Sequence, residues 1–317
     1  MTSRYISYLI EDVRLSTENT DFSDTIGIKD TEFLRFLNDG QQRIQNTIVQ
    51  QHPQVFLKEK TVSVTGDQEA YSLPIDAYLG NKVSQVEFNP QSTGKEYFYP
   101  LRPASLFERD SGSNGDPIKY IRQTGKILLI PIPDASVGQL RYNYVQKLPR
   151  LALRRGSVSS VTLDSNTNTV TALSLDVSTD SVDTNELSKW TRVSIVDEEG
   201  NVKMKNIKVT NVDGSTGVVS VDPSFSYDDG ETIGVGNYIV EGSYSSTHVL
   251  LDEMVERYLI AYATFKILQR DSNVTDLQVQ QSVLLEMESE IAEAYAEISD
   301  DIMEIPQIIS YDDDWVL

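Results

Sequence analysis

The spacing of apolar residues changes twice along this chain of 317 residues, and that change limits the fold more than any other feature. Near the N-terminus apolar residues recur every three to four positions, the period of an amphipathic helix. The spacing predicts one helix over residues 3–14 and a second that begins at Asp30 or Thr31, as its cap, and ends before Pro53. Gly40 interrupts the second helix, so we expect a bend or a close contact there. The apolar stripe of that helix comprises Phe33, Phe36, Leu37, Ile44 and Ile48.

Beyond Phe56 the apolar period falls to two, which indicates short strands separated by turns. The stretch from Gly156 to Glu241 differs in being rich in Ser, Thr, Val and Asp, with turns every 8–15 residues. That pattern predicts a compact antiparallel barrel or sandwich inserted as a unit. The expected strands are 61–64, 71–73, 83–88, 97–101, 118–122, 127–130, 140–145, 157–163, 169–173, 190–196, 202–209, 218–221 and 232–235, with a tight turn at Gly125-Lys126.

The helical period returns near the C-terminus. Thr247 is expected to cap a helix over residues 250–269, and Thr275 a helix over residues 277–298. The short link between them makes the two helices antiparallel neighbours, each about 30 Å long at about 1.5 Å per residue.

The order of these elements predicts an α+β fold: a bundle of N- and C-terminal α-helices with a long antiparallel β region inserted, including a small β-barrel or sandwich module. We expect a helical domain formed by residues 1–56 and 247–299, and a β domain of residues 57–155. The inserted β module would span residues 156–246, and an extended C-terminal arm residues 300–317.

Charge excludes some functions. The chain has 27 basic and 48 acidic residues, a net charge of −21, which excludes a general DNA-binding protein held by phosphate contacts but not one through which DNA passes. Residues 247–317 hold three bases and sixteen acids, whereas residues 88–155 hold eleven bases and five acids. This asymmetry reflects either solvated faces or complementary faces at which copies or partners meet.

The sequence carries little that predicts chemistry. There is no cysteine, which removes disulfides, thiolate zinc sites and cysteine nucleophiles. His52 and His248 lie at predicted helix boundaries, where a capping or surface role is expected. Gly234 and Gly236 lack the third glycine and the following helix of a dinucleotide loop. The carboxylates that could form a glycosidase-like pair lie in a stretch typical of a hairpin turn: Asp228, Asp229 and Glu231.

We therefore expect no enzyme, no cofactor and no metal site. The acidic run Asp312–Asp314 does not change this, because it lacks the alternating ligands of a Ca²⁺ loop. No apolar run approaches the roughly 18 residues of a membrane span, so no membrane partner is expected. Glu11 and Asp12 come before a signal-peptide core could form, so no export signal is expected either.

Three sets of residues are candidate contact sites. The last predicted helix carries an acidic face made of Glu286, Glu290, Glu293 and Glu297. The densest basic spot would contact phosphate or an acidic partner, or form a salt bridge at a domain junction; it comprises Arg150, Arg154 and Arg155. The arm has too few apolar residues for a core of its own, so these are expected to dock onto its own chain or a neighbour: Ile305, Ile308, Ile309, Tyr311, Trp315, Val316 and Leu317.

The order of several segments along the chain carries a resemblance to a known family. They are the helix DTEFLRFLNDGQQRI at 30–44, the strand YSLP at 71–74 and the strand LLIPIPD at 128–134, followed at a distance by a helical hairpin and a loose arm. Together they resemble the head-to-tail adaptor (connector) proteins of tailed double-stranded DNA bacteriophages. The resemblance covers residues 1–150 and 247–317 and leaves out the β stretch from Gly156 to Glu241.

The resemblance implies a virion structural protein at the head–tail junction, synthesised in the host cytoplasm. It would form a ring, commonly of twelve copies, with the arm reaching the portal protein and the β region facing the tail nozzle or tail tube protein. DNA would pass through without specific binding, and an acidic wall would let it slide during ejection. Two alternatives stay open: a β-rich tail-spike or carbohydrate-binding attachment module, whose aromatic side chains would stack on sugars, and a carboxylate-dependent hydrolase.

Overall fold

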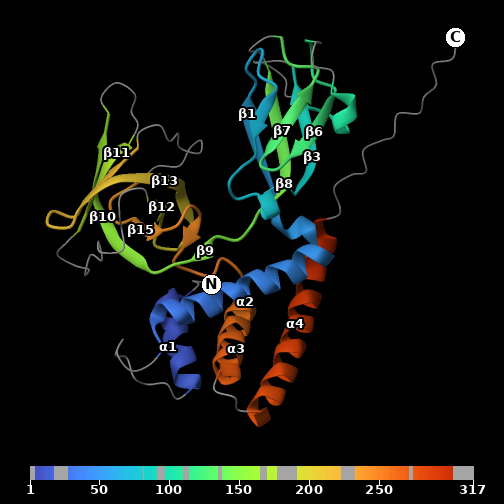
Figure 1. The fold of residues 1–317 in the computed structure, drawn as a ribbon. Coiled ribbons are helices and arrows are strands. Elements are labelled where there is room, and N and C mark those ends of the chain that lie inside the picture. The colour runs from blue at the N-terminus through green and yellow to red at the C-terminus, as the bar shows by residue number, and fades with distance from the viewer. Residues whose placement is uncertain are drawn as a thin grey trace.

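The computed structural model describes residues 4–17, 28–80, 82–90, 97–109, 114–134, 138–164, 170–176, 191–222, 233–270 and 274–302, without the side chains of 274–276 and 297–302. Helices from both ends of the sequence gather in one layer, and two β bodies lie on the same side of that layer (Figure 1). The predicted α+β class is therefore confirmed.

The helical layer contains α1 (Ile6–Ser16), α2 (Asp30–Gln51), α3 (Glu253–Arg270) and α4 (Val274–Ile302). Their apolar faces meet in one core, where Leu9, Phe33, Ile44 and Tyr258 are fully buried. α4 has 29 residues and is about 44 Å long, longer than the sequence indicates. It continues to Ile302, so the first three residues assigned to the arm are helical.

The capping residues predicted for three helices are wrong. Asp30 is the first residue of α2 and follows Lys29 as N-cap, while Thr275 lies inside α4. Thr247 lies well before Glu253, where α3 begins. Its carbonyl oxygen instead accepts a hydrogen bond of 3.0 Å from the backbone nitrogen of Ile6. Thr247 therefore fixes the start of α1, because a tertiary contact has taken the place of the local cap.

α2 and α3 approach closely at Gly40, as the sequence predicts. A Cβ atom at Gly40 would lie 2.9 Å from Cδ1 of Tyr262 and 3.1 Å from Cδ2 of Leu259, both buried. These distances are shorter than ordinary carbon contacts, so only glycine fits without displacement. α2 continues as one helix through this position.

The polar residues of α2 bind the connecting segment that passes over the helix. Asn38 Nδ2 donates to the carbonyl oxygen of Leu151 at 2.9 Å and its Oδ1 accepts from the Leu151 nitrogen at 2.8 Å. Gln41 Nε2 donates to the carbonyl oxygen of Pro149 at 2.8 Å, and Gln45 Oε1 accepts from the Leu148 nitrogen at 3.2 Å. The amide-rich pattern of this helix therefore attaches the β region to the helical layer.

Two four-stranded sheets form the first β body. One has the order β1-β8-β3-β4 and the other β2-β7-β6-β5. Their inner faces share a core that includes Phe88, Leu129 and Tyr142, so the sheets pack face to face. The tight turn between β6 and β7 is Thr124-Gly125, since Gln123 pairs with Lys126. The strands are β1 (Leu57–Ser63), β2 (Ala70–Ser72), β3 (Val83–Asn89), β4 (Tyr99–Pro100), β5 (Arg102–Pro103), β6 (Lys119–Gln123), β7 (Lys126–Ile130) and β8 (Gln139–Val145).

The second β body is a closed barrel of strand order β10-β11-β14-β13-β12-β15, in which β15 pairs back with β10. The last predicted strand, 232–235, is wrong: β15 lies further on, because Gly236 has φ +93° and the Gly234 nitrogen donates to Asn237 Oδ1 at 2.7 Å in a turn. The strands are β10 (Arg154–Leu163), β11 (Val170–Leu175), β12 (Arg192–Val196), β13 (Val202–Asp213), β14 (Val218–Val221) and β15 (Tyr238–Glu241).

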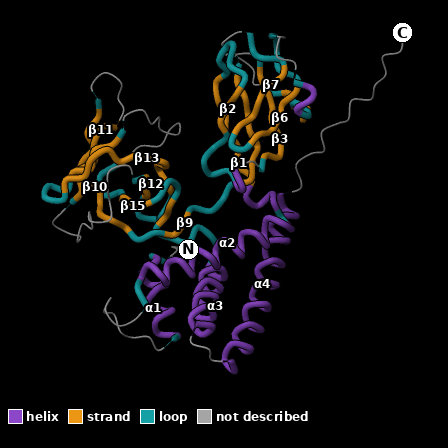
Figure 2. Tube along the Cα trace, viewed as in Figure 1, coloured by secondary structure: helices purple, strands orange, loops and turns teal. Residues whose placement is uncertain are grey.

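The chain enters and leaves the barrel at one place. There β9 (Arg150–Leu151) pairs in parallel with β16 (Ser245–Ser246). The division into four domains stays a proposal. The pairing of β9 with β16 supports it by bringing the two ends of the barrel segment side by side above α2 (Figure 2).

Candidate assembly interface

The outer face of α4 combines valines with the predicted acidic residues. Val279, Val283, Glu286, Glu290 and Glu293 follow one another at alternating steps of four and three, which places them on one helix face. The two valines are 61% and 38% exposed, and the three glutamates are exposed. The side chain of Glu297, the fourth predicted member, lies outside the described residues. This face is therefore apolar near the start of α4 and acidic further along.

The opposite face of α4 forms part of the helical core through Leu284, Ile291 and Tyr295. Glu288 also points inward: its carboxylate lies 2.7 Å from Arg43 Nε and accepts a hydrogen bond of 2.7 Å from the Tyr258 hydroxyl. Burial and this carboxylate raise the pKa of Tyr258. Glu288 thus links α2, α3 and α4 and is not part of the acidic outer face.

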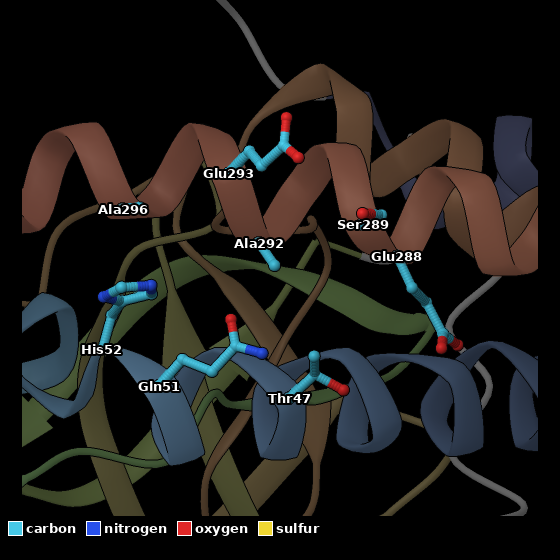
Figure 3. A pocket seen from close by; sticks show the side chains of 8 residues that line it. All are labelled: Thr47, Gln51, His52, Glu288, Ser289, Ala292, Glu293 and Ala296. Atoms are coloured by element: carbon cyan, nitrogen blue, oxygen red, sulfur yellow. The ribbon is translucent and has the colours of Figure 1, made fainter.

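A shallow groove of about 360 Å³ lies between α2 and α4. Figure 3 shows Thr47 and Gln51 of α2, with His52 after it, facing Ser289, Ala292 and Ala296 of α4 across this groove. Small side chains on α4 leave the space open. The lining has no cluster of nucleophiles or metal ligands, so we interpret the groove as a gap in the packing of α2 against α4.

A second apolar face lies on α1, and sequence reasoning missed it. Tyr8 is 53% exposed and Leu15 is 65% exposed, whereas Leu9 and Val13 on the other side of the helix are fully buried. The spacing of seven between Tyr8 and Leu15 was the available signal, because it places both on one face of the helix. Their exposure shows that this face lies opposite the core. Both α1 and α4 pack against α3, and they lie at opposite edges of the helical layer (Figure 2).

The three arginines of the predicted basic spot have different surroundings. Arg155 Nη2 lies 3.5 Å from Glu241 Oε2, an ion pair between β10 and β15. The Arg154 guanidinium lies over the rings of Tyr5 and Tyr238, 5.7 and 5.4 Å from their centroids. Arg150 is exposed. A role of these arginines in binding a partner stays a prediction.

His248 is buried, contrary to the surface or capping role expected for it. Only 2% of the residue is exposed, and its ring lies 4.3 Å from that of Tyr5, centroid to centroid. A Cβ atom on Gly200 would lie 2.5 Å from His248 Nδ1, so the glycine makes room for the imidazole. Burial lowers the pKa of His248 although Asp197, Glu256 and Glu199 act in the opposite direction. His52 follows the end of α2, where it lines the groove.

Other predicted features lie where the structure gives no geometry. Asp228, Asp229 and Glu231 are outside the described residues, and so are all the apolar residues named for the C-terminal arm. Among the residues that are described, no three His, Asp or Glu side chains gather in a group that could hold a metal ion. None of the described helices has the length and apolar character needed to cross a membrane.

One part of the fold matches a known family. It consists of the N-terminal helices and the β sandwich that is attached to α2. Residues 6–156 match the SU10 adaptor protein family. The match confirms the predicted resemblance to phage head-to-tail adaptors, and this family is one of phage structural adaptors, not of enzymes. A comparison with curated proteins found no match for the chain.

The matched segment ends just inside β10. It therefore contains α1, α2 and both sheets of the sandwich, including the Asn38, Gln41 and Gln45 contacts that attach the sandwich to α2. The rest of the barrel, α3 and α4 lie outside the match to the SU10 adaptor family. As phage structural adaptors, the members of that family are components of the virion.

Proposed function

We propose that this chain forms the adaptor ring that joins the capsid portal to the tail and lines part of the DNA passage. The observation that carries the proposal is the presence of two exposed faces with apolar residues at opposite edges of one helical layer. Two different faces that bind each other give a head-to-tail contact, and repeated head-to-tail contacts close into a ring when the rotation between copies allows it.

In this ring the α1 edge of one copy packs against the α4 edge of the next. Tyr8 and Leu15 on one side would be buried against Val279 and Val283 on the other. A tyrosine and a leucine at the centre of such a contact supply much of the binding free energy, about 1.5–3 kcal/mol for each large apolar side chain that becomes fully buried.

The portal protein and the tail nozzle or tail tube protein are the other proposed partners. The arm, with Trp315 at its end, would reach the portal protein, and the β bodies would face the tail. The family match supports this arrangement only in that the family is one of phage adaptors. A ring of twelve copies is the expectation that comes with the resemblance.

DNA would pass along the acidic end of the α4 face. Glu286, Glu290 and Glu293 are exposed there, and carboxylates repel the phosphate backbone at short range. Neutralising these three residues and Glu297 to glutamine should slow DNA ejection from assembled virions. An ejection rate equal to that of the unmodified virion would contradict this role.

The tail-spike or sugar-binding alternative loses part of its support. Its argument rests on aromatic side chains available for stacking, but Phe33, Phe88, Tyr142, Tyr144 and Tyr258 are all at most 1% exposed. These five rings serve the cores, whereas Tyr8, Tyr97 and Phe107 are 53%, 68% and 101% exposed.

The ring contact can be tested with matched variants. Val279→Glu with Val283→Glu, or Tyr8→Ser with Leu15→Ser, should prevent assembly on the portal protein, measured by sedimentation of the mixture. Leu106→Ser with Phe107→Ser is the control, because these residues are 61% and 101% exposed on the sandwich, away from the helical layer. Assembly of both edge variants at the normal level would overturn the proposed contact.

A further inference from the structure

A short turn on the sandwich presents two apolar side chains to solvent. The chain leaves β5, the terminal strand of its sheet, and forms the 3-10 turn Leu106–Glu108. Phe107 is 101% exposed, the most of any large apolar residue that the structure describes, and Leu106 is 61% exposed. A ring left wholly in water contributes no hydrophobic stabilisation to the fold that carries it. The pair Leu106 and Phe107 is called the anchor below.

The turn is held by its own capping box. Glu108 Oε1 accepts a hydrogen bond of 3.1 Å from the backbone nitrogen of Ser105, and the Glu108 nitrogen donates to the Ser105 carbonyl oxygen at 3.1 Å. The second oxygen of the same carboxylate, Oε2, lies 2.7 Å from Lys119 Nζ on β6. One glutamate therefore closes the turn and attaches it to the neighbouring strand.

Arg109 attaches the other end of the turn. Its Nε donates to Glu69 Oε1 at 2.7 Å and its Nη2 donates to Glu69 Oε2 at 2.6 Å, the two-bond geometry in which arginine holds a carboxylate most firmly. Glu69 directly precedes β2, which lies at the opposite edge of the sheet from β5. The segment that carries the anchor is thus fixed to both edges of one sheet.

The core of the sandwich does not account for the anchor. Lys119 and Ile121 lie on one face of β6, because side chains alternate along a strand. On that face Ile121 and Leu128 are buried, at 2% and 4% exposure, in a small cluster with Ala104. The cluster includes neither residue of the anchor. A phenylalanine that is held in place but covers nothing has the character of a binding residue.

The charges around the anchor indicate the kind of partner. Glu108 is paired with Lys119 and Glu69 with Arg109, so these four side chains sum to zero. A nucleic acid would need cations that are not already matched by carboxylates. A lipid surface would likewise need a basic surplus beside the apolar residues. An apolar pocket of another protein, without net charge, fits both the exposed ring and its neutral surroundings.

The place of the turn in the fold leaves it free in the proposed ring. The sandwich stands on one side of the helical layer, and the ring contact uses the α1 and α4 edges of that layer (Figure 1). We propose that Leu106 and Phe107 anchor the sandwich in an apolar pocket of the tail nozzle or tail tube protein. The identity of this partner rests on the proposed function, whereas the anchor itself rests on the contacts of the turn.

A second copy of this chain is a poorer occupant. Two side chains supply far less than the roughly 800 Å² per partner that a stable pair of proteins buries. The tail protein differs because a ring offers the anchor once in every copy. Repeated weak contacts to one large partner add up to strong binding.

Binding to dense arrays of the full-length chain tests the anchor without a ring. The chain is captured at high density on a sensor surface, and the tail nozzle and tail tube proteins of the same phage are passed over it separately. One of them should bind the unmodified chain. Leu106→Ser with Phe107→Ser should raise the apparent Kd by at least about tenfold, with an unchanged circular dichroism spectrum because both side chains are exposed.

The matched control is Leu163→Ser with Val235→Ser, which removes two apolar side chains, 46% and 77% exposed, from the barrel. It should leave the apparent Kd unchanged. Binding of neither tail protein would overturn the inference, as would an equal Kd for the anchor variant or an equal loss in the control. Anchor-dependent binding to anionic vesicles, to DNA or between copies of the chain, in place of the tail protein, would overturn it too.

A charge reversal tests whether the fixed turn matters. Glu69→Arg breaks the ion pair with Arg109 but keeps the anchor, and it should weaken binding at least about threefold because the side chains must then be ordered on binding. Glu69→Arg with Arg109→Glu restores an ion pair in the reversed sense and should return the apparent Kd to that of the unmodified chain. A double variant as weak as the single one would contradict the role given to this pair.

A fluorescent label reports the contact directly. Because the chain has no cysteine, Leu106→Cys creates one site for a dye whose emission shifts to the blue in an apolar pocket. Adding the tail protein should shift the emission, whereas a dye at Val235→Cys should show no change. Equal shifts at both sites, or none at Leu106→Cys, would overturn the inference. None of these measurements uses the portal protein, so their failure leaves the proposed ring standing, and failure of ring assembly leaves them interpretable.

Discussion

Asp76 joins the sandwich to the barrel, and its removal is the sharpest test of how these two bodies are held together. Its carboxylate accepts hydrogen bonds from the Tyr144 hydroxyl at 3.2 Å and Gln146 Nε2 at 2.9 Å, and it lies 3.2 Å from Lys205 Nζ on β13. The Asp76 side chain is fully buried and that of Lys205 is 15% exposed. Asp76→Ala would therefore leave a cation and two polar groups without this acceptor.

The magnitude follows from these contacts. Removing one partner of a buried ion pair costs about 3–5 kcal/mol of unfolding free energy. The lower end applies here because Lys205 keeps some access to water, so we expect a loss of about 3 kcal/mol for Asp76→Ala. Asp76→Asn keeps the volume and one acceptor oxygen and should cost about 1–2 kcal/mol. Adding Lys205→Met to Asp76→Asn should restore part of that loss, since no unpaired charge then remains.

Urea denaturation followed by circular dichroism measures these differences. Glu59→Ala is the matched control, because this carboxylate lines the same cleft between β1 and β13 as Asp76 but is 55% exposed and lies 3.7 Å from Arg141. Exposed pairs contribute about 0–1 kcal/mol, so the control should be near the unmodified chain. An Asp76→Ala variant within about 0.5 kcal/mol of the unmodified chain would refute the reasoning.

Three further predictions concern the helical layer and its junction with the barrel. Gly40→Val should destabilise the protein by about 1–3 kcal/mol in thermal unfolding, because the new side chain overlaps Tyr262; an unchanged midpoint would show that the layer yields there. Glu288→Ala should lower the free energy of unfolding in urea by about 1–3 kcal/mol, since the buried Tyr258 hydroxyl loses its acceptor. A variant in which only Arg43 becomes more mobile and the free energy of unfolding is unchanged would contradict this. Burial lowers the pKa of His248 below 6.5, so below pH 6.5 the unfolded chain binds a proton that the folded chain does not, and stability falls as pH falls. His248→Gln should therefore lose less stability than the unmodified chain between pH 7.5 and 5.5, and equal losses would count against this.

Helices were predictable here because their signal is local. The buried stripes of α2 and α4 follow the apolar spacing, as Phe33, Ile44 and Ile291 show. The caps at Thr247 and Thr275 were not predictable, because a threonine ahead of an apolar stripe is equally compatible with a tertiary contact or a place inside the helix. Thr247 is held by Ile6 from the other end of the chain, a contact that no local rule contains.

The pairing of strands that are distant in sequence was the second feature that could not be predicted from the sequence. β15 contains Tyr238–Glu241, but its neighbour β10 begins at Arg154, and nothing near either segment specifies that they pair. The burial of His248 has the same origin, since the room for its ring comes from Gly200, which is distant in sequence.

Of the two candidate assembly faces, the one on α4 could be predicted from the sequence and the one on α1 could not. The repeated glutamates of α4 marked its outer face, whereas Tyr8 and Leu15 could be separated from the core residues only after the buried side of α1 was known. Helix period identifies two faces of α1 with apolar residues, and only packing decides which one is left exposed.

Electron microscopy of the chain mixed with its portal protein is the most direct test of the central claim. The account predicts a closed ring on the portal, with α1 of each copy, through Tyr8 and Leu15, against Val279 and Val283 of α4 in the next copy. A chain that stays monomeric beside the portal would contradict the account. A ring in which neighbouring copies touch through the barrels, with both helical edges exposed, would contradict it equally.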